Sequence, residues 1–134
     1  MHYGIKISRV SFEIVVKFEG IDAAGNAADI VLSNSVTYDG VAPVFSNVSA
    51  DINSTSVDYT LSEVLASGAI TFTRVGGSVD SYSPHVVNLT AAERSSGLFS
   101  GVLTNTPTLV NDAIYSVDFD GVDAAGNTAT TVNF

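Results

Sequence analysis

A short phrase that occurs twice in the chain limits the folds that the sequence can adopt. Residues 20–27 read GIDAAGNA and residues 121–128 read GVDAAGNT, which places Asp22 and Asp123 at 123 − 22 = 101 positions apart. The flanking apolar residues keep the same spacing in both copies. A period of this length is that of one small domain, so the sequence predicts one complete repeat preceded by the last part of another.

The boundary between the two copies is predicted near a short stretch with turn and linker residues. Residues 37–45 read TYDGVAPVF, in which Asp39 and Gly40 favour a turn, and Pro43 stiffens the chain before a first edge strand. We therefore expect residues 1–38 to be the two-strand end of a preceding repeat and residues 39–134 to be a complete repeat.

The fold class follows from a hydrophobic pattern with a period of two. Runs rich in Val, Ile, Thr, Phe and Tyr alternate with polar residues and are separated by Gly, Asn, Asp and Ser. Seven such runs in the complete repeat predict an all-β antiparallel sandwich, preceded by an extra β-hairpin over residues 12–20 and 28–36. The seven expected strands are residues 44–50, 56–61, 70–75, 85–89, 99–103, 113–122 and 128–134.

The repeated phrase predicts a structural turn between the last two strands. Asp123 can accept hydrogen bonds from the backbone that follows it, while Gly126 and Asn127 tolerate a positive φ. Gly121 ends the preceding alternating run. A second structural feature lies upstream, where the spacing of Leu109 and Tyr115 is typical of a corner closed by a tyrosine hydroxyl.

Composition excludes several classes of partner. Of the 134 residues, 46% are apolar and 14% are charged, and the formal net charge is −9. Nucleic acid and anionic membrane surfaces are therefore electrostatically disfavoured. The absence of cysteine excludes disulfides and thiolate metal sites. The chain contains no leader-like or membrane-spanning apolar run, so we expect any export signal to lie outside it.

The order of these phrases resembles that of bacterial immunoglobulin-like repeats. The resemblance rests on VTYDGVAPVF from Val36, YTLSEVLASGAITFTRVGG from Tyr59, SPHVVNLTAAERSSG from Ser83 and TPTLVNDAIYSVDFDGVDAAGN from Thr106. Such repeats form tandem arrays in large secreted or surface-anchored proteins, including adhesins. The resemblance implies an immunoglobulin-like sandwich and an extracellular or cell-surface location.

Junctions between such domains can hold calcium, a hard cation that takes six to eight oxygen ligands. Asp39, together with Asp22 and Asn26 from the preceding turn, could supply some of these oxygens. No EF-hand or other calcium motif accompanies them. The alternative is that these residues are solvated turn residues of an acidic protein. No other cofactor is expected.

The sequence gives little indication of catalysis. The only histidines are His2 and His85, and no nucleophile elbow, metal-ligand pair or phosphate loop is present. Glu63 and Glu93 could form a carboxylate pair, although exposed acids at strand ends are far commoner. Carbohydrate binding is a further alternative, with Tyr82 as the one candidate platform in a chain that lacks Trp.

The partial repeat leaves three outcomes open, because an isolated two-stranded hairpin with an apolar face is not stable alone. The hairpin could dock on the complete repeat, pair with another copy by strand addition and assemble into filaments, or belong to a longer protein. We expect a non-catalytic structural or adhesive module whose partners are neighbouring repeats or other copies of the protein. A self-assembling subunit and a carbohydrate-binding module are the alternatives.

Overall fold

The computed structural model describes residues 11–14, 16–33, 36–50 and 55–134. The chain divides into two compact units, Met1–Val41 (unit 1) and Ala42–Phe134 (unit 2). The sequence placed this boundary between residues 38 and 39, close to the same linker. Each unit is described by itself.

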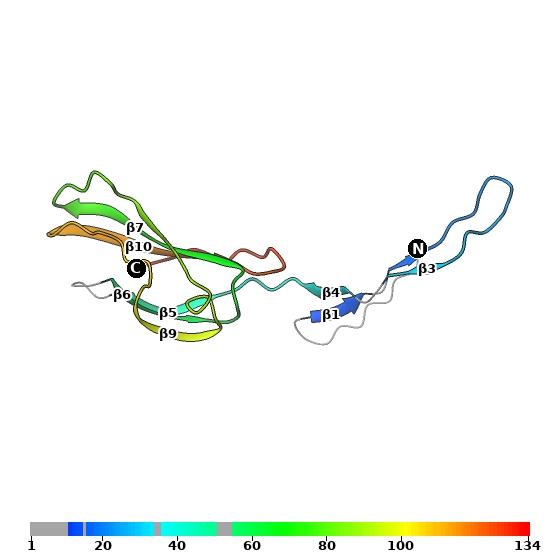
Figure 1. The fold of residues 1–134 in the computed structure, drawn as a ribbon, viewed down its shortest axis with the longest axis horizontal. Coiled ribbons are helices and arrows are strands. Elements are labelled where there is room, and N and C mark those ends of the chain that lie inside the picture. Colours follow the sequence, from blue (N-terminus) through cyan, green and yellow to red (C-terminus); the bar gives the residue numbers. More distant parts are fainter. Residues whose placement is uncertain (1–10, 15, 34–35, 51–54) are drawn as a thin grey trace. The chain divides into compact units, whose positions relative to one another are not determined.

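Unit 2 is an antiparallel sandwich of two sheets (Figure 1). One sheet has three strands in the order β5-β6-β9, and the other has four in the order β11-β10-β7-β8. In a constant-type immunoglobulin domain the fourth strand lies beside the fifth, whereas here it lies beside the third. The strands are β5 (Phe45–Ala50), β6 (Ser56–Leu61), β7 (Ser67–Gly77), β8 (His85–Asn88), β9 (Gly97–Val102), β10 (Ala113–Val122) and β11 (Val132–Asn133).

The core lies between the two sheets and follows from alternation along the strands. In β6 every second residue is buried, and in β10 the buried residues include Val117 and Phe119. The ring of Phe119 lies 5.8 Å from that of Phe45 and 5.9 Å from that of Tyr59, centroid to centroid. These separations are within the range of favourable aromatic pairs. The centre of the core is therefore an aromatic contact that joins both sheets.

The all-β sandwich of seven strands that the sequence predicted is confirmed, and two strands differ most from their predicted lengths. β7 is longer than the predicted 70–75 because it pairs with β10 along the whole length of that strand. β11 is shorter than the predicted 128–134, and Thr128 contributes only a single bridge to Val122. Residues 129–131, between this bridge and β11, have no strand pairing.

Unit 1 contains the predicted hairpin, divided into two short paired segments. β1 (Ser11–Ile14) pairs with β4 (Val36–Asp39), and β2 (Lys17–Phe18) pairs with β3 (Val31–Leu32). Both pairs are antiparallel, so the first half of unit 1 runs against the second half. Residues 1–10 lie outside the described part of the chain.

Candidate functional site

The repeated DAAGN phrase forms the same turn in both units. In unit 2 the Asp123 carboxylate accepts hydrogen bonds from the backbone N–H and the side-chain amide of Asn127, both at 2.8 Å. In unit 1 the Asp22 carboxylate accepts the same two bonds from Asn26, also at 2.8 Å. The glycine between them has a φ of 92° in unit 2 and 90° in unit 1, a conformation that favours glycine. The phrase therefore encodes a self-contained turn in either unit.

The two turns differ in their surroundings. Asp123 is 4% exposed, whereas Asp22 is exposed to solvent. Hydrogen bonds from Asn26 lower the pKa of Asp22. Burial acts to raise the pKa of Asp123, but the hydrogen bonds from Asn127 outweigh it, so the pKa of Asp123 is lowered as well. Both carboxylates are held ionised by the turn itself.

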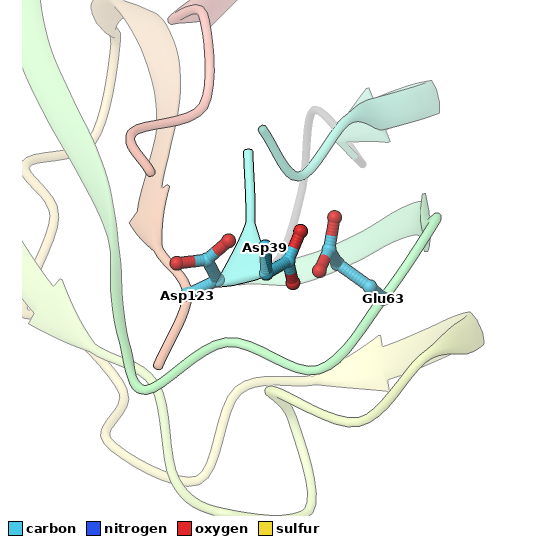
Figure 2. Close-up of side chains that lie close together, drawn as sticks. All are labelled: Asp39, Glu63 and Asp123. Atoms are coloured by element: carbon cyan, nitrogen blue, oxygen red, sulfur yellow. The ribbon is translucent and has the colours of Figure 1, made fainter. Parts of the chain in front are cut away.

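Two carboxylates meet at the end of unit 2 that carries the second turn. An oxygen of Glu63, which follows β6, lies within 4.8 Å of an oxygen of Asp123, which follows β10 (Figure 2). Two carboxylates offer at most four oxygens, whereas Ca²⁺ takes six to eight. The two side chains alone therefore cannot complete the coordination of Ca²⁺. Figure 2 also draws Asp39, which belongs to unit 1.

The three residues from which the sequence predicted a calcium site all lie in unit 1, but at different places in its hairpin. Asp39 pairs with Ser11 at one end of the β1–β4 ladder, and its carboxylate accepts a bond from the Val41 backbone at 3.1 Å. Asp22 and Asn26 lie in the turn beyond β2 and bond to each other. Within unit 1 the register does not bring Asp39 to the other two residues. Calcium binding by these residues stays a prediction.

Tyr115 closes a corner at the start of β10. Its hydroxyl accepts a hydrogen bond from the backbone N–H of Val110 at 3.0 Å and donates one to the Asp80 carboxylate at 2.6 Å. Leu109, which the sequence paired with Tyr115, packs half-buried against the core. Gly121, the glycine within β10 for which the sequence predicted a structural role, is buried against Leu65.

Asp80 is the centre of a polar cluster that the sequence interpretation missed. Its side chain is 1% exposed, and one oxygen accepts from Tyr115 and contacts His85 Nε2 at 2.6 Å. The other oxygen accepts from the Tyr82 backbone at 2.9 Å. The hydrogen bonds from Tyr115 and then His85 lower the pKa of Asp80 to about 2. An Asp in a loop can accept a hydrogen bond from the backbone N–H two residues on, and this turn tendency is the sequence signal for Asp80.

Glu93 is a second buried acid, and its role is structural. It is 2% exposed, and its carboxylate accepts hydrogen bonds from the backbone N–H groups of Thr90 and Thr104, each at 2.7 Å. Burial acts to raise its pKa, but these bonds outweigh that effect and lower it. The carboxylate is thus committed to Thr90 and Thr104, while Glu63 lies beside Asp123. The Thr-x-x-Glu spacing is a capping-box signal that could have identified this role.

The described cluster around Asp80 is organised to hold loops together. The single proton of the Tyr115 hydroxyl is donated to Asp80, and its oxygen is occupied by the Val110 N–H. Tyr82, the candidate platform for a sugar ring, is 85% exposed in the adjacent loop. One exposed aromatic ring does not define a sugar site by itself.

No family model, curated protein or solved structure matches the chain. Among the described residues, the structure contains no helix with the length and apolar character needed to cross a membrane.

Proposed function

We propose that the chain is a non-catalytic structural and adhesive module of an extracellular bacterial repeat protein. The observation that carries this proposal is the recurrence of one hairpin at a fixed interval. Phe18 pairs with Val31 in unit 1, and Phe119 pairs with Val132 in unit 2. Each residue of the pair in unit 2 lies 101 positions after its counterpart in unit 1. An interval of this length is the size of one domain with its own hydrophobic core, as expected for tandem modules.

The chemistry of unit 2 supports a mechanical role over a catalytic one. The buried acids Asp80, Glu93 and Asp123 direct their carboxylates at protein donors in loops and turns. Groups bound in this way stabilise loop geometry. The resemblance to bacterial immunoglobulin-like repeats adds the extracellular and adhesive parts of the proposal.

Force spectroscopy on the full chain, pulled from its two ends, tests the mechanical role. Unit 2 spans residues 42–134. Its unfolding should release roughly 300 Å of chain in one step, at about 3.3–3.6 Å per residue. Phe119→Ala should lower the unfolding force, because the aromatic contact between the sheets is lost. Gradual extension without a discrete step would contradict a mechanical role for the module.

A metal titration tests the calcium prediction separately. Thermal unfolding of the full chain would be followed in CaCl₂, in MgCl₂ and after chelation. A rise in Tm with Ca²⁺ that Mg²⁺ does not reproduce would support a junction site. Equal Tm values in all three conditions would contradict the calcium prediction.

A further inference from the structure

The hairpin of unit 1 reproduces the main-chain register of the last two strands of unit 2. Phe18 pairs with Val31 as Phe119 pairs with Val132. The bridge between Ile21 and Ala27 corresponds in the same way to the bridge between Val122 and Thr128. The bond from the Ser33 N–H to the Val16 carbonyl, at 2.9 Å, also has its counterpart in the bond from the Phe134 N–H to the Val117 carbonyl, at 2.9 Å.

The same apolar positions are buried in unit 2 and exposed in unit 1. Phe119 is 0% exposed, whereas Phe18 is 56% exposed. Val132 is half-buried against the core of unit 2, whereas Val31 is 59% exposed. The hairpin of unit 1 thus presents the face that its counterpart packs into a sandwich. Phe18 and Val31 are cross-strand partners, so their exposed side chains share one face, and an exposed apolar face of this kind marks an interaction surface.

Unit 2 shows which structure covers this face. Phe119 packs against Phe45 of β5 and Tyr59 of β6, so the first two strands of the repeat supply the opposite layer. Within its own sheet, β10 lies between β11 and β7 and pairs with both. In unit 1, β2 has β3 as its one neighbour among the described strands. The edge of β2 that corresponds to the β7-facing edge of β10 is therefore available for pairing.

A second copy of the chain is a poor source of this partner. In each copy, β10 already occupies the place beside β7, with pairing that runs from Ala113 to Val122. Tyr115 further secures β10 through Val110 and Asp80. The residue of unit 1 at the corresponding position is Ile14, which has no hydroxyl. Exchange of β10 for the hairpin of unit 1 would therefore lose the corner bonds without replacing them.

We propose that the face of unit 1 formed by Phe18 and Val31 docks against the first five strands of another repeat of this type, joined upstream in the same polypeptide. The partner is thus a segment equivalent to β5–β9, and the hairpin completes it as its sixth and seventh strands. The contact continues an interface that is already present within unit 2. This inference rests on the register and the burial, and it holds whether or not the module is adhesive.

A tandem protein tests the inference directly. A copy of residues 42–101 placed before Met1 of the full chain restores the 101-residue period, because position 1 corresponds to position 102. The amides of residues 16–20 and 28–32 should exchange with solvent at least about 100-fold more slowly than in the original chain, as strands in a folded core do. Phe18→Asp in the tandem protein should abolish that protection and leave unit 2 protected.

Two further measurements keep the proposal falsifiable. Since Ile14 lacks the corner hydroxyl, the tandem protein would also be made with Ile14→Tyr. If the amides of residues 16–20 and 28–32 stay unprotected in both tandem proteins while unit 2 is folded, the proposal is overturned. Light scattering on the original chain should show a monomer. A dimer that Phe18→Asp dissociates would assign the face to a second copy, which also overturns the proposal.

Discussion

The hydroxyl of Tyr115 donates a hydrogen bond to the carboxylate of Asp80 at 2.6 Å, and so connects the start of β10 to the loop that joins β7 and β8. The same hydroxyl accepts a bond from the Val110 backbone, which belongs to the segment just before β10. One phenol thus holds two loops that are far apart in the sequence. This explains why a single oxygen should affect the stability of the whole sandwich.

Tyr115→Phe should destabilise unit 2 by about 1–2 kcal/mol, because the Val110 N–H and the Asp80 carboxylate each lose a partner. The measurement is equilibrium unfolding in urea, followed by tyrosine fluorescence or circular dichroism. Tyr82→Phe is the matched control, since Tyr82 is 85% exposed, and its urea midpoint should be unchanged. Equal midpoints for both variants would show that the corner bonds do not contribute to stability.

The stability of unit 2 should fall with acid in a window set by Asp80. Hydrogen bonds from Tyr115 and His85 lower the pKa of Asp80 from 3.8 to about 2. Because the folded state holds this carboxyl ionised, its contribution is present above the ordinary pKa and is lost as the pH falls through about 2. The test compares urea midpoints from pH 5 to pH 2 for the protein and for Asp80→Asn.

The pH profile of Asp80→Asn should be flatter across this window. The other acids with lowered pKa values, among them Glu93 and Asp123, are present in both proteins and cancel in the comparison. Parallel profiles for the two proteins would mean that Asp80 titrates normally in the folded state.

Glu93→Gln should destabilise unit 2 by about 1.5–3 kcal/mol, the range for hydrogen bonds to charged groups. A carboxylate can accept bonds from both the Thr90 and Thr104 N–H groups, whereas glutamine presents one oxygen and a competing donor. Urea unfolding measures the effect, with Glu19→Gln on the exposed hairpin of unit 1 as the control. An unchanged midpoint for Glu93→Gln would contradict the assigned role.

Local patterns made most of the fold predictable from the sequence. The alternation along residues 113–122 gave β10 with the same bounds as in the structure, and the repeated DAAGN phrase gave the turn after it. Both features depend on residues that are close together in the chain. A two-residue period and a turn motif need no information from the rest of the molecule.

The polar clusters were not predictable in the same way. Asp80 and Tyr115 are 35 residues apart, and their contact depends on the packing of β7 beside β10. Glu93 reaches Thr104 across another loop, which no short pattern specifies. The sequence also could not show that Asp39 pairs with Ser11 in the β1–β4 ladder, away from Asp22 and Asn26. Tertiary packing fixes all of these relationships.

The repeat supplies a matched pair of glycine substitutions. A Cβ atom on Gly121 would lie 2.6 Å from Leu65 Cδ1, whereas a Cβ on Gly20, its counterpart in unit 1, would meet no atom within 4 Å. Leu65 is buried and cannot move aside freely. Gly121→Ala should therefore destabilise unit 2 by about 1–3 kcal/mol through overpacking. Gly20→Ala should leave the urea midpoint of unit 2 unchanged. If the two variants behaved alike, the packing of Leu65 against β10 would not be as close as the structure shows.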